Sequence, residues 1–447
     1  MLRLASPVVL AQVGIMLMGV VDTAMVGRVS PATIAAVALG HIYWVTVTIP
    51  GIGVLLVLDP IVSQAVGARD AAGIARGVQR GILLALALSV PTALLLIPGE
   101  VFFGALRQPV EVTPIAATFS RWSILGVVPF YLFVTFRQSL QAMATVRPVV
   151  VAIVAANLLN GGLNWVLIYG HLGLPALGAV GSAISTVLSR WCMLALLLAF
   201  GWRRLRPALL PWRPESRRLS PILRMVRIGL PIGFQQWVEI AVFAFGAVAI
   251  GWFGTVPLAG HEIALNLAAL TFMVPMGIAA AAAAMVGRAI GRRDLPAARR
   301  DAVAALVVGV AFMTVAAFAF LAFPHSLAAI FVSDPATVEM AASLILIGGL
   351  FQVFDGIQGV ATGILRGTGD TRVPMLLHLG GFWGVGIPLS LSLAFALGMG
   401  PRGIWLGYVG SIGVVALLQL MRVRWRMAQD IQRLEMEEPS ELAVVVD

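Results

Sequence analysis

Residues 67–70 read GARD, and residues 291–294 read GRRD. The same offset of 224 positions relates LRLASP at 2–7 to VRIGLP at 226–231. Distant segments seldom share one offset by chance, so we infer that the chain holds two copies of one unit. Each copy carries six apolar runs, and an even number means that both copies enter the membrane in the same direction.

The composition indicates a protein that lies mostly in lipid. Hydrophobic residues make up 60% of the 447 residues and charged residues 11%, whereas soluble domains have about 45–50% apolar and about 25% charged residues. All 30 cationic residues are Arg, and Cys192 is the single cysteine. A catalytic Lys, a disulfide framework and a cysteine metal site are therefore excluded. The net charge of +10 lies in short loops, a pattern of membrane topology rather than of nucleic-acid binding.

Twelve apolar runs are long enough to cross a bilayer. They cover roughly residues 7–27, 35–58, 78–98, 118–142, 149–169, 177–200, 228–252, 259–286, 302–323, 340–364, 374–397 and 403–421. We predict an all-α polytopic protein of the inner membrane, with two six-helix lobes in parallel repeat. Of the 30 Arg residues, 24 lie in loops on one side and 4 on the other. This bias predicts that both termini are cytoplasmic.

The order of the spans also predicts the domain organisation. We expect a first lobe at 1–202, a cytoplasmic linker at 203–221, a second lobe at 222–426 and a low-order cytoplasmic tail at 427–447. Two lobes of a parallel repeat can enclose a cavity that opens alternately to either side, which is typical of secondary transporters.

Three acids lie inside apolar runs: Asp22, Glu239 and Asp355. An ionised carboxylate facing lipid costs about 2.5–3.5 kcal/mol even on insertion scales, and these segments contain no Arg nearby to neutralise it. We therefore expect each acid to face a cavity or a partner. Such a carboxylate can exchange a proton, a sodium ion and a cationic substrate. The alternative is a structural acid that only forms hydrogen bonds.

Five amide side chains accompany these acids: Asn157, Asn160, Asn164, Gln352 and Gln358. The spacing of the three Asn residues places them on one helical face, and we predict that they form a polar cluster with Asp22 as ligands for a cation. The two Gln residues flank Asp355. Hydrogen bonding between helices is the alternative role for all five.

The sequence lacks the motifs of known enzyme classes. Walker, dinucleotide-loop and catalytic-triad patterns do not occur. His261-Glu262 resembles the start of a zinc-protease motif, but Leu265 stands where the second His is required. Glu262 lies close to the expected outer interface, where an acid costs little. We therefore expect a protein that is not an enzyme and needs no cofactor besides a coupling ion.

Three segments resemble the multidrug and toxic compound extrusion (MATE) family, and its bacterial NorM branch in particular: residues 21–27 (VDTAMVG), 164–170 (NWVLIYG) and 363–371 (GILRGTGDT). The resemblance covers nearly the whole chain. It implies a V-shaped two-lobe fold and export of cationic, often aromatic, compounds in exchange for Na⁺ or H⁺. It also implies that the family's acids of helices 1, 7 and 10 correspond to Asp22, Glu239 and Asp355. Glu262 departs from the family pattern, in which Gln follows the His.

We therefore expect a monomeric antiporter that exports cationic amphipathic small molecules by alternating access, in contact with membrane lipid and without a nucleic-acid partner. One alternative is a lipid-linked saccharide flippase of the same superfamily, which should carry Arg in its cavity for a pyrophosphate. An ion channel and a membrane-embedded enzyme are alternatives from other classes. The coupling ion, the substrate, the conformational state, the stoichiometry and the role of Glu262 stay open from the residues alone.

Overall fold

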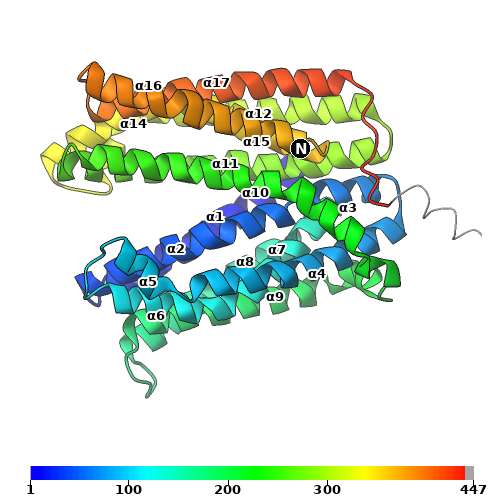
Figure 1. Ribbon diagram of the computed structural model, residues 1–447, viewed down its shortest axis with the longest axis horizontal. Helices are drawn as coiled ribbons and strands as arrows, with labels where there is room; N and C mark the ends of the chain where they lie inside the picture. The colour runs from blue at the N-terminus through cyan, green and yellow to red at the C-terminus, as the bar shows by residue number, and fades with distance from the viewer. Residues whose placement is uncertain (1, 438–447) are drawn as a thin grey trace, which may run out of the picture. The chain divides into compact units, whose positions relative to one another are not determined.

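The computed structural model describes residues 2–437, and its regular structure over that range is entirely helical (Figure 1). The first half of the chain contains α1 (Leu2–Val26), α2 (Pro31–Leu55), α3 (Leu58–Gly67), α4 (Ala71–Leu96), α5 (Gly99–Ala105), α6 (Thr113–Ser123), η1 (Ile124–Gly126), α7 (Val127–Ala142), α8 (Arg147–Tyr169), α9 (Gly178–Leu209) and η2 (Pro214–Arg217). The second half contains α10 (Leu219–Gly251), α11 (Thr255–Gly291), α12 (Leu295–Ala322), α13 (Pro324–Ala329), α14 (Pro335–Gly367), α15 (Arg372–His378), η3 (Leu379–Gly386), α16 (Ile387–Leu391), η4 (Ser392–Ala396) and α17 (Pro401–Ala428).

Twelve helical spans in the described residues are long and apolar enough to cross a membrane, which confirms the expected number. Three of them are built from consecutive pieces. The pieces are α2 with α3, α6 with η1 and α7, and α15 with η3, α16 and η4. In the last of these spans η3 and η4 are π-helical, so its backbone is wider than an α-helix just after His378.

The repeated GARD and GRRD stretches form the same turn. Arg69 and Arg293 adopt a left-handed backbone, with φ of 57° and 59°. Asp70 and Asp294 then cap α4 and α12, because each Oδ1 accepts a hydrogen bond from the backbone N–H three residues on, at 2.7 Å and 2.9 Å. One turn ends a helix and begins the next, and this shared task accounts for the recurrence of the stretch.

The described chain divides into two compact units. One contains residues 10–233 and 434–437, and the other contains residues 2–9 and 234–433. Residues 2–9 of α1 therefore belong with the second half of the chain, and residues 434–437 belong with the first half. The segment 203–221, expected as a linker, supplies the end of α9, all of η2 and the start of α10.

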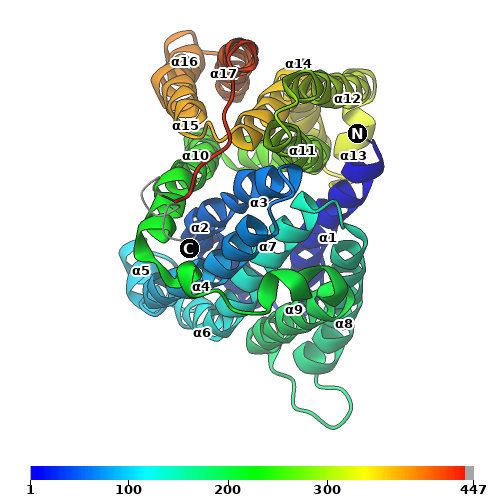
Figure 2. The same ribbon diagram turned by 90° about the vertical axis from the view of Figure 1, so that its right-hand side faces the viewer.

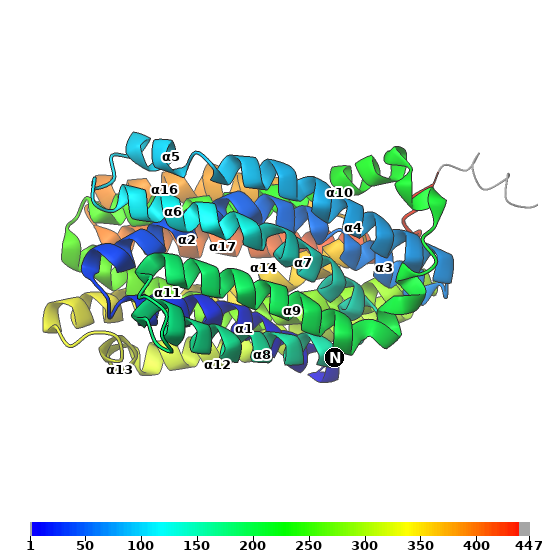
Figure 3. The ribbon, with the colours of Figure 1, turned by 90° about the horizontal axis from the view of Figure 1, so that it is seen from below.

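Small residues let helices approach closely within each unit. In the first, α8 and α9 lie side by side, and a Cβ on Gly181 would lie 2.4 Å from the carbonyl oxygen of Leu167 (Figure 2). In the second, α11 packs on α14, and a Cβ on Gly363 would lie 2.3 Å from the carbonyl oxygen of Ala279. Such glycine contacts replace the hydrophobic driving force that is missing between helices in lipid. The short α5 runs beside α6 at one end of its unit (Figure 3).

A buried glutamine fastens the segment after α9 to α4. The Nε2 group of Gln79 donates to the carbonyl oxygens of Ala208 and Pro211, at 3.1 Å each. Its Oε1 accepts hydrogen bonds from the Arg213 N–H and the Ser216 hydroxyl, at 2.9 Å and 2.8 Å. Arg80 Nη2 also donates to the Glu215 carbonyl oxygen at 3.0 Å, so two consecutive side chains of α4 hold the segment expected as a linker.

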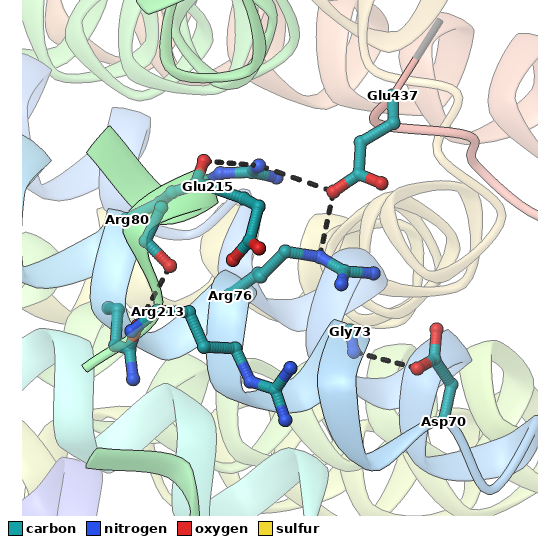
Figure 4. Close-up of polar contacts among 9 residues, drawn as sticks. Asp70, Gly73, Arg76, Arg80, Arg213, Glu215 and Glu437 are labelled. Atoms are coloured by element: carbon teal, nitrogen blue, oxygen red, sulfur yellow. Dashed lines mark hydrogen bonds and ion pairs between the residues drawn. The ribbon is translucent and has the colours of Figure 1, made fainter. Parts of the chain in front are cut away.

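The end of the described chain also packs on α4 (Figure 4). Glu437 Oε1 lies 2.7 Å from Arg76 Nε and 3.4 Å from Arg80 Nη2. The Leu434 N–H donates to Gln64 Oε1 at 2.7 Å. A tail of low order was expected; residues 430–437 form no helix or strand, and Glu437 contacts two arginines of α4. Residues 438–447 lie outside the described residues.

Candidate functional site

The first-half acid, Asp22, lies buried on α1 with both carboxylate oxygens hydrogen-bonded. Asn164 of α8 donates to its Oδ1 at 2.6 Å, and Thr186 of α9 donates to its Oδ2 at 2.7 Å. Asn160, one turn before Asn164, accepts a second hydrogen bond from the same Asn164 amide at 3.3 Å. Two donors on two oxygens suit an ionised carboxylate, which can only accept.

The three asparagines of α8 do not all reach Asp22. Asn160 and Asn164 are fully buried and lie in the cluster. Asn157 instead donates to the carbonyl oxygens of Gly14 and Ile153, at 2.9 Å each. It therefore joins α8 to α1 about two turns away from the acid. Thr186, which had no signal of its own in the sequence, takes the second carboxylate oxygen instead.

A buried arginine accompanies this cluster. The guanidinium of Arg190 on α9 lies over the ring of Trp44, 3.7 Å from its centroid, and 5.2 Å from that of Phe130. Its charge and that of Asp22 act on one another. The segment around Asp22 contains no Arg to neutralise it, and this cation comes from another helix. The signal was present in the sequence, since an Arg inside an apolar span is itself unusual.

The second-half acids converge on one amide. Gln358 Nε2 donates to Glu239 Oε1 on α10 and to Asp355 Oδ1 on α14, at 3.0 Å each. Asp355 is buried, with 8% of its surface exposed, and Glu239 is half-buried. No ion pair with an arginine is recorded for either acid within residues 2–437. The pair is thus two carboxylates that share one neutral donor.

Two like charges this close repel each other, and low polarity around them strengthens the repulsion. A proton or a metal cation bound between them would remove the repulsion. This arrangement can therefore take up one positive charge, which the Asp22 cluster, with its own cation, does not require.

The second candidate glutamine does not contact the acids directly. Gln352 is fully buried and exchanges hydrogen bonds with the Thr271 hydroxyl of α11, at 3.1 Å and 3.3 Å. Glu262 lies on the exposed side of α11, while the neighbouring His261 is buried and accepts a hydrogen bond from Trp405 Nε1 at 3.1 Å. Within the described residues, no hydrogen bond or ion pair joins His261 or Glu262 to Glu239 or Asp355.

Comparison with known proteins places the chain in a family. The MatE family model matches residues 7–166 and 231–391, one segment in each half. The "Probable multidrug resistance protein NorM" of Mesorhizobium japonicum is 35% identical over 94% of this chain and 92% of its own length. The NorM protein of Bradyrhizobium diazoefficiens is 36% identical over 95% and 92%. "Multidrug resistance protein MdtK" of Yersinia pseudotuberculosis is 32% identical over 96% and 95%.

Solved structures agree with this placement. The eukaryotic MATE transporter AtDTX14 superposes with a TM-score of 0.84 at 21% identity, covering 95% of this chain and 98% of that one. A multidrug resistance MATE family transporter in an outward-facing conformation superposes with a TM-score of 0.86 at 21% identity, covering 96% and 95%. At 21% identity the solved structures show that the fold is the same, and the family model and the relatives show that the sequence is related. The chain belongs to the MatE family, the multidrug and toxic compound extrusion transporters.

Proposed function

We propose that this protein is a secondary active multidrug efflux transporter that exports cationic amphipathic compounds in exchange for Na⁺ or H⁺. The observation that carries the proposal is the pair of carboxylates, Glu239 and Asp355, joined through the Gln358 amide. One positive charge binds there at a time, either the coupling ion or the cation of the substrate. Competition for one site is sufficient to link entry of the ion to release of the drug.

The ligand chemistry suits either coupling ion. No group of three or more His, Cys, Asp or Glu side chains capable of holding a metal occurs in the described part of the chain. A sodium ion at the pair would therefore take its remaining oxygens from amides, hydroxyls and water, which are normal ligands for a hard cation. A proton would need only one carboxylate oxygen.

The Asp22 cluster has a different role in this proposal. A protonated Asp22 becomes a hydrogen-bond donor, and one of its present donors must then accept, the Thr186 hydroxyl by rotating its hydrogen or the Asn164 amide by turning its oxygen to the acid. Protonation thus rearranges the contacts that join α1 to α8 and α9. We propose that this rearrangement changes the conformation of the first half while the acid pair binds the exchanged ion.

The saccharide flippase is disfavoured by the surroundings of the buried arginine. A flippase needs an arginine free to bind a pyrophosphate. Arg190 is buried and stacked on Trp44, and the charge that acts on it is that of an acid, Asp22, which would repel a pyrophosphate. Its surroundings fit a positioning role and not an anion site.

The proposed orientation places both termini in the cytoplasm of a bacterial inner membrane, supported by the Arg bias between loops. Substrate then enters from the cytoplasm or the inner leaflet, and a monomer in contact with lipid is sufficient. Cys substitutions at 215 and 334 in a Cys192→Ser background test this orientation. Residue 215 should react only with a thiol reagent inside the cell, and external labelling of 215 would overturn it.

Proteoliposomes test the function itself. We would measure transport of ethidium, a lipophilic cation, with a pH gradient or a Na⁺ gradient imposed separately. The gradient of the coupling ion should drive ethidium against its concentration gradient, and the variants Glu239→Gln and Asp355→Asn should lose this driven transport. Equal ethidium flux without any ion gradient would indicate a channel and contradict the proposal.

A further inference from the structure

Buried polar side chains continue from the acid pair along α14. The Thr362 hydroxyl lies 2.8 Å from the Gln358 carbonyl oxygen and 3.0 Å from Gln419 Oε1 of α17. Gln419 Nε2 lies 2.9 Å from His378 Nδ1, and Gln235 Nε2 of α10 lies 3.2 Å from His378 Nε2. We call Gln235, Thr362, His378 and Gln419 the polar column. It joins four helices of one compact unit.

The polar column has a direction. Asp355, Gln358 and Thr362 follow one another at helical spacing towards the end of α14 at Gly367. Seven residues along a helix advance by about 10 Å. Gln235 lies one turn before Glu239, nearer the start of α10. The Arg bias places the end of α14 and the start of α10 on the cytoplasmic side, so the polar column leads from the acids towards the cytoplasm.

His378 is the titratable member of the polar column. It is fully buried, with 1% of its surface exposed, and ends α15 where the π-helical η3 begins. Its Nδ1 lies 3.0 Å from the Pro374 carbonyl oxygen, which can only accept, and 2.9 Å from the Gln419 amide nitrogen, which can only donate. A hydrogen at Nδ1 therefore bonds to Pro374 and requires the Gln419 amide to be turned, so that its oxygen faces the ring. Nε2 then accepts a hydrogen bond from the Gln235 amide. A neutral imidazole offers one donor and one acceptor, and this environment matches both.

Two amides beside the His378 ring allow it to bind a second proton. Gln235 and Gln419 each present a rotatable amide to one ring nitrogen. An amide can offer N–H or oxygen to the ring by turning about its last side-chain bond. A second proton on His378 therefore requires the oxygens of both amides to face the ring, that of Gln419 at Nδ1 and that of Gln235 at Nε2. The turn of Gln235 breaks the 3.4 Å contact between Gln235 Nε2 and the Thr362 hydroxyl, so the proton on the ring and the polar column change together.

The charged groups on the four helices of the polar column are Arg224, Arg227 and Glu239 on α10, Glu339, Asp355 and Arg366 on α14, Arg372 on α15, and Arg402, Arg422, Arg424 and Arg426 on α17. Among these groups, the negative charge of Glu239 acts electrostatically on His378. Arg422 is paired with Asp370 at 2.7 Å. The charge of the acid pair therefore acts on the ring, and a proton on His378 is attracted most when Glu239 is ionised.

We propose that His378 is the acceptor through which a proton bound at the Glu239–Asp355 pair leaves towards the cytoplasm. The proton leaves a carboxyl O–H, passes through water beside the Thr362 hydroxyl and bonds to the lone pair of a ring nitrogen. The carboxylate regains its negative charge, and the imidazolium then gives its proton to cytoplasmic water. This inference rests on the proposed function and assigns the proton route within it.

The matched experiment compares two buried histidines of the same unit. His378→Gln removes the titratable ring and keeps a side chain that can donate and accept. His261→Gln is the control, because His261 is also fully buried but bonds to Trp405 and not to the polar column. Both variants are reconstituted, and ethidium export is measured from pH 5.5 to 8.5 with a pH gradient and, separately, with a Na⁺ gradient.

His378→Gln should lower export driven by the pH gradient at least tenfold at saturating ethidium and flatten its pH profile, while the ethidium KM changes less than twofold. His261→Gln should keep the wild-type profile. Should His378→Gln fold poorly, Gln235→Leu removes the Nε2 partner while keeping the ring and should displace the midpoint of the pH profile. A wild-type pH profile in both His378→Gln and Gln235→Leu would overturn the inference.

A parallel Glu239→Gln variant separates the two proposals. If Glu239→Gln loses driven export while His378→Gln behaves as wild type, the acid pair stands and the role of His378 is refuted. If Glu239→Gln exports fully, the proposed function itself fails. Equal loss in His378→Gln and His261→Gln, with a lowered melting temperature in both, would assign His378 a structural role and also overturn the inference.

Discussion

The two halves of the molecule treat their buried acids in opposite ways. Asp22 has a donor on each carboxylate oxygen and an arginine whose charge acts on it. Glu239 and Asp355 share the single amide of Gln358 and have no recorded arginine partner in the described residues. The contacts of Asp22 offset part of the cost of burying its charge, whereas the pair, which lacks an opposite charge, gains from binding a cation. A sequence repeat can therefore keep the fold while its two copies differ in their chemistry.

The largest effect should come from removing a charge of the uncompensated pair. Glu239→Gln and Asp355→Asn should each lower ion-driven ethidium export by at least about 10-fold, since each removes an exchangeable charge but keeps the shape. The melting temperature should not fall, because repulsion is relieved. Glu262→Gln is the matched control, as this acid lies exposed on α11 and should change export less than twofold. Near-normal export by both Glu239→Gln and Asp355→Asn would show that the acid pair does not couple ion entry to export.

Removing the cation of the compensated site should act on stability. Arg190→Leu loses a desolvated cation–π contact with Trp44, worth about 2 kcal/mol, and leaves Asp22 without its opposite charge. We expect the free energy of unfolding in mixed detergent to fall by at least this amount. In the double variant with Asp22→Asn, part of the loss should be recovered, with a coupling energy of about 0.5–3 kcal/mol. Strictly additive losses would show that Asp22 and Arg190 do not compensate each other.

The donors of Asp22 provide a smaller test of the same comparison. Thr186→Val keeps the shape of the side chain and removes the hydrogen bond to Oδ2, which should cost about 1.5–3 kcal/mol for a charged acceptor. The unfolding titration used for Arg190 measures it. Introduced together with Asp22→Asn, Thr186→Val should cost much less. An equal cost in both backgrounds would mean that the hydroxyl serves the α9 backbone and not the acid.

The smallest effect should come from Asn157. Its amide bonds to backbone carbonyl oxygens of α1 and α8, so Asn157→Leu should cost about 1 kcal/mol of stability and leave export unchanged. Asn164→Leu, on the same helical face, should lower export as well as stability, because Asn164 donates a hydrogen bond to Asp22. Equal export by these two variants would show that the α8 face acts as a whole, as the spacing alone suggests.

Periodicity and repetition predicted much of the fold. The length of the apolar runs predicted twelve spans, because a bilayer fixes how many apolar residues a helix needs. The GARD and GRRD stretches recurred because one cap geometry, with Arg69 or Arg293 in the left-handed region, is needed in both halves. The docked end of the chain was missed, since Glu437 meets Arg76 across most of the sequence and no local pattern announces such a pair.

The candidate sites were predicted less completely, for a geometric reason. Helical spacing places Asn157 and Asn164 on one face, but it does not say which residue lies opposite each of them at a given depth. That depends on how α8 packs against α1 and α9. For the same reason, Arg190 and His378 could be recognised as buried polar groups but not assigned to Asp22 or to the polar column. The spacing of Gln358 from Asp355 made it a candidate, but its contact with Glu239 could not be predicted, because that contact depends on how α10 packs on α14.

The most direct test of the central claim is competition at the acid pair in purified protein. Ethidium bound to the protein in detergent is titrated with Na⁺ at fixed pH, and with acid at fixed Na⁺, while ethidium fluorescence is followed. We expect Na⁺ or H⁺ to displace ethidium from the wild type and from Glu262→Gln, and the displacement to disappear in Glu239→Gln combined with Asp355→Asn. Undiminished displacement in that double variant would contradict the account, because the coupling ion would then bind elsewhere.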